Sequence, residues 1–170
     1  MLFLVKIFVL AYNPNMTLEQ KVARLLIKQG KTLAIGESCS GGLLSHRLTN
    51  VPGSSRFLKA ALVTYSNEAK SKLLKVPQAL LKKHGAVSEQ TALMMAKGAR
   101  TLMKSDFGLS ITGIAGPDGG SKTKPVGLTF IALSTPHESL CLKCTFKGSR
   151  HQIKSKSTTQ ALKLLLNFLA

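Results

Sequence analysis

The stretch TLAIGESCSGGLLSHRLTN, residues 32–50, holds a strand, a loop and a helix in direct succession. Its first part, TLAI (32–35), is short, apolar and β-branched at both ends, which predicts a buried strand. GESCSGG (36–42) follows as a loop of small residues, and GLLSHRLTN (42–50) opens a helix. This order of elements is typical of a layered α/β domain.

The rest of the chain continues the mixture of helices and strands. Thr17 and Gln20 form a capping-box pattern that begins a helix ending at Gly30. Further strands are predicted at FLKAALVTYS (57–66), FGLSIT (107–112), VGLTFIALS (126–134) and SLCLKCTF (139–146), the last two as a hairpin around Pro136. Further helices are predicted at NEAKSKLL (67–74), at EQTALMMAKGARTLM (89–103) and from about residue 150 to residue 170. We therefore expect a single α/β domain with a mixed sheet.

The first sixteen residues need a separate interpretation. Their apolar run, MLFLVKIFVLAYNPN, is too short to span a bilayer, and its only lysine lies inside the run rather than ahead of it as in a signal peptide. We expect residues 1–16 to form an extension outside a domain that covers residues 17–170. An edge strand or a peripheral anchor is the alternative.

The charge balance is strongly basic. Lysine and arginine number 24 against 7 acidic residues, for a net charge of +17, which attracts nucleic acid, anionic lipid or phosphorylated metabolites. The basic residues are spread along the chain, aromatic residues make up only 5% of it, and there is no tryptophan. This pattern disfavours a nucleic-acid partner, whose binding needs a clustered basic face or stacking platforms.

The cysteines do not indicate disulfide or metal chemistry. Cys141 and Cys144 form a CxxC pattern, but they lie in an alternating stretch that predicts a strand. The sequence has no second CxxC, and with Cys39 the cysteines number three, which is not a disulfide framework. No His, Asp or Glu cluster has the spacing of metal ligands. We expect a cytoplasmic protein without a metal, a cofactor or a membrane segment.

Three segments combine glycines with hydroxyl groups: GESCSGG (36–42), VPGSS (51–55) and TGIAGPDGG (112–120). In open α/β sheets, ligands bind beyond the carboxyl ends of the strands, and we interpret the three segments as lying there. The helix that follows GESCSGG would offer free N–H groups to a phosphate. VPGSS carries two candidate nucleophiles, Ser54 and Ser55, and a serine hydroxyl needs a base to take its proton. Because no histidine is well placed for this, a lysine whose pKa is lowered by burial is the candidate base. From composition and spacing alone, Lys70 is better explained as a solvated helix residue.

Six motifs, in order, resemble the CinA C-terminal domain family of nicotinamide-nucleotide amidohydrolases. They are GESCSGG, VPGSS, VTYSNEAK, GAVSE, ITGIAGPDGG and KPVG, and the resemblance runs from about Thr17 to Ala170. It implies a three-layer α/β/α domain with a mixed sheet, and hydrolysis of nicotinamide mononucleotide to nicotinate mononucleotide and ammonia. The alternative is a catalytically silent module that binds nucleotide or nucleic acid. Apart from the resemblance, we expect a homo-oligomer, a dimer, because the helix predicted at 89–103 is largely apolar (Leu93, Met94, Ala96 and Met103); packing of these residues in the core is the alternative.

The resemblance also implies roles for individual residues. Ser55 would be the nucleophile, Lys70 its base and Tyr65 an assisting hydroxyl. Substrate binding would involve a wider set, namely Thr112, Gly113, Arg150, Ser38, Gly41 and Gly42. Arg150 suits the phosphate because its planar guanidinium binds two oxygens at once.

Overall fold

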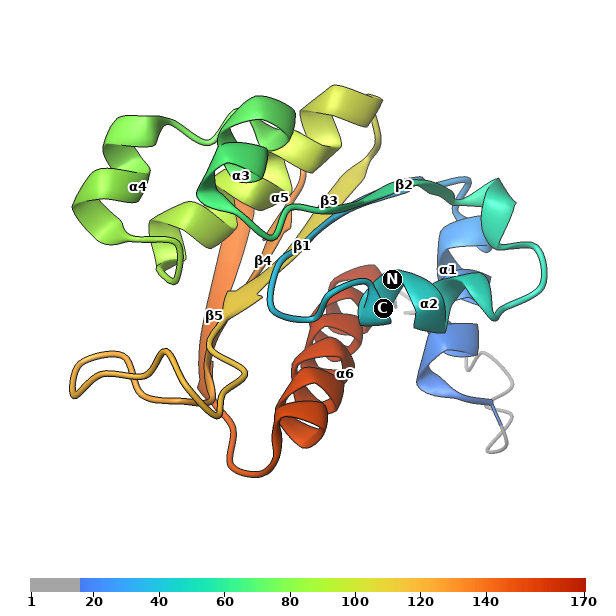
Figure 1. Ribbon diagram of the computed structural model, residues 1–170. Coiled ribbons are helices and arrows are strands. Elements are labelled where there is room, and N and C mark those ends of the chain that lie inside the picture. The colour runs from blue at the N-terminus through green and yellow to red at the C-terminus, as the bar shows by residue number, and fades with distance from the viewer. Residues whose placement is uncertain (1–15) are drawn as a thin grey trace, which may run out of the picture.

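The central strand of the sheet is β3 (Phe107–Gly113), which pairs in parallel with β1 (Leu33–Glu37) and antiparallel with β4 (Leu128–Ser134). A computed structural model of the protein describes residues 16–170 (Figure 1). Apart from one partly exposed residue, Gly113 at the end of β3, these three strands are buried along their length, because helices cover both faces. Their near-continuous apolar sequences follow from that burial on two sides.

The two outer strands complete a sheet in the order β2-β1-β3-β4-β5. Strand β2 (Leu58–Val63) runs parallel to β1, and β5 (Ser139–Thr145) runs antiparallel to β4. Both are edge strands with exposed positions along their length. The expected mixed sheet and the hairpin of its last two strands are confirmed, and Cys141 and Cys144 lie in β5 as free cysteines.

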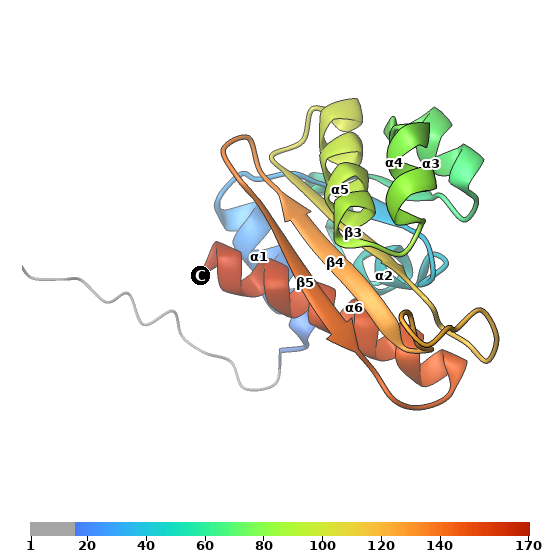
Figure 2. The ribbon, with the colours of Figure 1, turned by 90° about the vertical axis from the view of Figure 1, so that its left-hand side faces the viewer.

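Among residues 16–170, six helices and a short 3₁₀ turn at Ser54–Arg56 surround this sheet. One face carries α1 (Leu18–Lys28), α2 (Leu43–Thr49) and α6 (Arg150–Leu169), as Figures 1 and 2 show. The other face carries α3 (Asn67–Leu74), α4 (Gln78–His84) and α5 (Glu89–Met103). The three-layer α/β/α domain is therefore confirmed.

The helix boundaries follow from capping residues. Thr17 and Gln20 bond reciprocally at the start of α1, and Ser149 and Gln152 do the same at the start of α6. Each capping box satisfies two backbone N–H groups that the first turn of a helix leaves without a partner. The second of these boxes fixes where α6 begins, and so places Arg150 in its first turn.

The topology brings one set of loops to a single edge of the sheet. Because β1, β2 and β3 are parallel, the segments that come after them lie at their common carboxyl edge, where α/β folds bind ligands. Two of the three glycine-rich segments, 36–42 and 112–120, lie there. The third, VPGSS (51–55), precedes β2 and lies at the opposite edge.

The interpretation of residues 1–16 as an extension falls outside the described residues, except for Met16. Its sulfur accepts a hydrogen bond from the guanidinium of Arg24 at 3.8 Å. Within residues 16–170, no helix is both long and apolar enough to cross a membrane.

Candidate functional site

Lys70 is a buried lysine in the middle of α3. Its side chain is 1% exposed, and its amine lies 2.8 Å from the carbonyl oxygen of Thr64, 3.5 Å from that of Tyr65 and 3.0 Å from the hydroxyl of Ser38. A neutral amine has two N–H groups and one lone pair. In the structure the amine donates to all three oxygens. In the neutral form, two N–H groups donated to the carbonyl oxygens leave the lone pair for the Ser38 hydroxyl, which is the arrangement of a base beside a nucleophile.

The surroundings of Lys70 favour this neutral form. Burial lowers the pKa of Lys70 below the ordinary lysine range, because a charged ammonium loses its hydration in the interior. No carboxylate among residues 16–170 forms an ion pair with it. A lysine in such a setting stays neutral down to a lower pH than a surface lysine does.

Ser38 is held in place by the end of β1. Its backbone N–H donates to the carbonyl of Ile111 at 2.9 Å, so the pairing of β1 with β3 continues through the serine. The loop turns sharply after it, and the N–H of Gly41 donates back to the Ser38 carbonyl. The hydroxyl is therefore fixed at the carboxyl edge of the sheet, facing Lys70.

Glu37, directly before Ser38, occupies the start of α2. Its fully buried carboxyl group accepts hydrogen bonds from the backbone N–H groups of Gly42, Leu44 and Ser45 at 2.9–3.1 Å. The prediction that this helix start offers free N–H groups to a phosphate is therefore wrong, because an internal carboxyl group already takes them. The Gly42 N–H is bound by Glu37 and the Gly41 N–H by the Ser38 carbonyl, so neither glycine offers a free N–H group to a ligand.

Ser55 is not brought to Lys70. It lies exposed in the turn before β2, whereas Lys70 comes after that strand. A six-residue strand spans about 20 Å, far beyond the reach of a serine and a lysine side chain. The expected pair of Ser55 with Lys70 is corrected to Ser38 with Lys70, and Ser38, expected only to bind substrate, provides the hydroxyl.

A pocket of about 260 Å³ opens above this pair. The predicted residues Ser38, Tyr65, Lys70, Thr112, Gly113 and Arg150 all line it, together with Cys39, Ala86, Val87, Ile114, Ala115, Gly116, Asp118 and Gly119. Small and apolar groups make up most of the wall, which suits a flat organic ring. The pocket is thus a concave site with a few polar groups, as is usual for small-molecule sites.

Tyr65 and Arg150 meet across the mouth of the pocket. The guanidinium donates to the Tyr65 hydroxyl at 2.9 Å and to the carbonyl of Gly116 at 2.6 Å. These bonds join the start of α6 to the loop after β2 and to the 114–127 loop. Figure 2 shows the 114–127 loop beside α6. The Tyr65 side chain is 62% exposed, so it lies at the rim and its hydroxyl does not reach the buried amine of Lys70 directly.

The turn 84–87 forms one wall of the pocket, and side chains hold all four of its carbonyl groups. The amine of Lys124 donates to the carbonyls of residues 84 and 87 at 2.7 and 2.8 Å. The hydroxyls of Ser88 and Thr91 donate to the carbonyl of residue 85, and the buried hydroxyl of Thr112 donates to that of residue 86 at 2.7 Å. The Thr112 hydroxyl therefore positions this wall. The role of Thr112 in contacting substrate stays a prediction.

Replacing Lys124 with methionine is expected to raise KM for the substrate about 10-fold with little change in kcat. The substitution removes two hydrogen bonds from a charged donor to backbone carbonyls, which loosens the wall but leaves the Ser38–Lys70 pair intact. Steady-state kinetics would measure it. Lys122→Met, an exposed change in the same loop, is the control, and equal KM values for the two variants would contradict the assigned role.

The sequence interpretation missed the wall and the role of Glu37. The wall carries Ala86 and Val87, ordinary residues whose function depends on a turn brought close by Lys124. No sequence signal points to them. Glu37 was detectable, because an acidic residue at the end of a buried strand needs nearby donors, and the helix start just after it supplies them.

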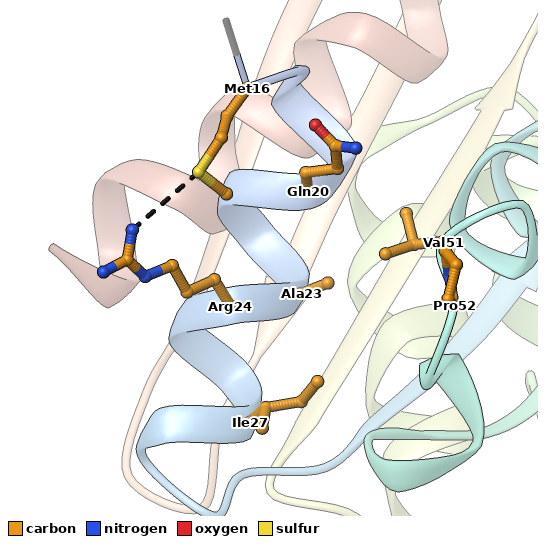
Figure 3. Close-up of a pocket in the computed structure, with 7 residues that line it drawn as sticks. All are labelled: Met16, Gln20, Ala23, Arg24, Ile27, Val51 and Pro52. Carbon is orange, nitrogen blue, oxygen red and sulfur yellow. Dashed lines mark hydrogen bonds between the residues drawn. The ribbon is translucent and has the colours of Figure 1, made fainter. Parts of the chain in front are cut away.

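A larger pocket, of about 490 Å³, lies between α1 and the turn at Val51 and Pro52 (Figure 3). Figure 3 shows its lining residues, among which Arg24 is the one charged side chain and bonds to Met16. Its lining residues include no nucleophile and no base. This pocket therefore offers no group for nucleophilic or acid–base chemistry. In the part of the chain that the structure describes, no cluster of His, Cys, Asp and Glu is suited to a metal ion.

Comparison with known proteins agrees with the fold and with the motifs around this pocket. A family model described as the CinA C-terminal domain matches residues 15–169. The chain belongs to the CinA C-terminal domain family. A CinA-like protein of Syntrophus aciditrophicus is 51% identical over 155 residues, and one of Syntrophotalea carbinolica is 50% identical over 153 residues. These stretches cover 91% and 90% of this chain but 37% of each relative, so the chain spans little more than a third of their length.

Solved CinA structures share the whole architecture. A competence-damaged protein (CinA) superfamily protein of Klebsiella pneumoniae superposes with a TM-score of 0.86 at 33% identity, covering 89% of this chain and 95% of that one. The competence/damage inducible protein CihA of Agrobacterium tumefaciens gives 0.83 at 38% identity, covering 89% and 97%. The names of these CinA proteins state no reaction, so the chemistry must be argued from the site.

Proposed function

We propose that this CinA domain hydrolyses the carboxamide of nicotinamide mononucleotide to nicotinate mononucleotide and ammonia. The observation that carries the proposal is the contact of 3.0 Å between the buried amine of Lys70 and the hydroxyl of Ser38. A buried lysine without an acidic partner costs folding free energy, and such groups cluster at functional sites. The small apolar walls of the pocket and the cationic Arg150 at its mouth fit a flat ring that carries a phosphate.

In the first half of the reaction, Ser38 Oγ attacks the carboxamide carbon while its proton passes to the neutral amine of Lys70. The carbonyl oxygen becomes an oxyanion, which hydrogen-bond donors in the pocket would stabilise. The C–N bond then breaks as Lys70 returns the proton to the departing nitrogen. Ammonia leaves, and the acyl group stays on Ser38 as an ester.

In the second half, a water molecule attacks the ester carbon and gives its proton to Lys70. The bond from carbon to Ser38 Oγ breaks, and Lys70 returns that proton to the serine oxygen. The product leaves as the acid and loses its remaining proton to the solvent, where ammonia takes up a proton to become ammonium, and the enzyme returns to its starting state. Each proton transfer at Ser38 and at the departing nitrogen uses the same amine.

The pH dependence of the reaction is set by the burial of Lys70. Because burial lowers its pKa, and because only the neutral amine accepts a proton, kcat/KM is expected to rise with pH along a limb governed by Lys70. The midpoint of that limb should lie below the ordinary lysine range. A pH–rate profile measures it, and a rate that falls as the pH rises across the same range would contradict Lys70 as the base.

The direct test is incubation of the purified chain with nicotinamide mononucleotide, with ammonia and nicotinate mononucleotide measured together. Equal molar amounts of the two products are expected. If the folded chain consumes no substrate at any concentration, the proposal is wrong. Ammonia without nicotinate mononucleotide would show a different reaction.

The alternative, a silent module that binds nucleotide or nucleic acid, rests on the net charge of +17. It predicts association with DNA or RNA that weakens steeply with salt, together with no release of ammonia. A binding titration at low salt, run beside the ammonia assay, separates the two proposals.

A further inference from the structure

Lys154 brings a second positive charge to the loop that carries Ser38. It lies in α6 one turn beyond Arg150, and residues four apart share one face of a helix. A Cβ atom added to Gly41 would lie 3.4 Å from the Lys154 amine, so the ammonium rests directly over this loop. Gly41 has a φ of +60°, a conformation in which a side chain is strained, and its missing side chain leaves the space the amine occupies.

The charge of Lys154 reaches the pocket. Burial raises the pKa of the Cys39 thiol to about 11, and the positive charge of Lys154 opposes that rise. Cys39 lines the pocket directly beside Ser38. Lys154 is therefore close enough to act on an anion bound at the pocket mouth.

Neither cation of this face of α6 is neutralised by an acid. Among residues 16–170, the ion pairs use the basic residues Lys31, Arg47 and Lys72. Arg150 donates to two uncharged oxygens, those of Gly116 and the Tyr65 hydroxyl. Arg150 lines the pocket, and Lys154 lies one turn further along α6 beside its loop. Asp118, the acidic residue among those that line the pocket, forms an ion pair with neither, so the two cations make a site suited to a dianion.

We propose that Lys154 and Arg150 together hold the phosphate of a mononucleotide substrate, and that Lys154 makes the enzyme prefer a nucleotide to the corresponding nucleoside. This inference rests on the proposed function and deepens it. Arg150 offers a planar fork to two phosphate oxygens, and Lys154 offers a compact point charge from the side of the Gly41 loop. In the mononucleotide, the ribose separates the phosphate from the carboxamide. The phosphate can therefore lie at the rim beside Arg150 while the carboxamide reaches the buried Lys70.

The test compares nicotinamide mononucleotide with nicotinamide riboside, which lacks the phosphate. For Lys154→Met we expect KM for the mononucleotide to rise on the order of 10-fold, the effect of one lost charged hydrogen bond, with kcat little changed. The riboside should be hydrolysed equally by the variant and the parent. Lys154→Arg should restore most of the preference, and Lys163→Met, an exposed change near the other end of α6, should have no effect.

An equal loss on both substrates, or none on either, would overturn the role of Lys154. Calorimetric titration of both compounds into the parent and into Lys154→Met keeps this result separate from the proposed function. If the parent binds the mononucleotide more tightly than the riboside but releases no ammonia, the hydrolysis fails while the phosphate site stands. If the parent binds both equally, the phosphate site fails whatever the hydrolysis assay shows.

Discussion

Replacing Ser38 with alanine is expected to lower kcat for ammonia release from nicotinamide mononucleotide by about 10,000-fold or more. Loss of a catalytic nucleophile has effects of this order, because the oxyanion donors and the binding pocket alone retain only a small part of the rate enhancement. The substitution removes one oxygen atom at a position whose backbone is fixed by the bond to Ile111. Steady-state assays would measure the loss, and circular dichroism would establish that the variant is folded.

The control for this variant is Ser55→Ala. Ser55 is an exposed serine that precedes β2, and removing its hydroxyl should leave kcat within about 2-fold of the parent, since surface changes away from a site have small effects. The pair of variants separates the two serines cleanly. Full activity in folded Ser38→Ala, or loss of activity in Ser55→Ala, would contradict the assignment of the nucleophile.

The second large effect is expected for Lys70→Met, which should lower kcat by about 100- to 10,000-fold, the usual contribution of a general base. Methionine has nearly the length of lysine and tolerates burial, so the change removes the amine and keeps the packing. The limb of the pH–rate profile assigned to Lys70 should disappear from whatever activity remains.

Lys72→Met is the matched control, because Lys72 lies on the same helix but is exposed and pairs with Glu68. An exposed ion pair of this kind contributes little to stability. The account would be contradicted if Lys72→Met and Lys70→Met lost activity equally, or if Lys70→Met kept the same pH dependence as the parent.

Much of the fold could be predicted from local signals. The buried strands have continuous apolar sequences, and the capping residues Thr17 and Ser149 mark the first and last helices. VPGSS (51–55) directly precedes the strand predicted at 57–66, and placing it at the carboxyl edge was wrong. Its position at the opposite edge follows only when β2 is known to run parallel to β1.

The choice between Ser38 and Ser55 shows why the candidate site was only partly predictable. Lys70 lies after β2 and Ser38 lies after β1, and two neighbouring parallel strands bring the segments at their carboxyl ends to the same edge of the sheet. Parallel pairing was not fixed by the sequence of either strand, since it depends on the crossover between them. Once the pairing is known, Ser38 is the serine that reaches Lys70.

Features that depend on tertiary contacts had no sequence signal. The burial of Lys70 results from the packing of α3 against its neighbours, and the sequence alone describes an ordinary lysine in a polar helix. Lys124 and Lys154 likewise gain their roles from carbonyl groups or a glycine far away in the chain. The expected dimer, the cytoplasmic location and the absence of a cofactor stay predictions.

The most direct test of the central claim, an acyl-enzyme formed on Ser38, is to run the reaction of the parent chain in the presence of hydroxylamine. An ester intermediate partitions between water and this stronger nucleophile, so the hydroxamate of nicotinate mononucleotide should form, in a ratio to the acid that rises in proportion to the hydroxylamine concentration. Folded Ser38→Ala should form neither product. Formation of the acid alone at every hydroxylamine concentration would contradict the acyl-enzyme and with it the role assigned to Ser38.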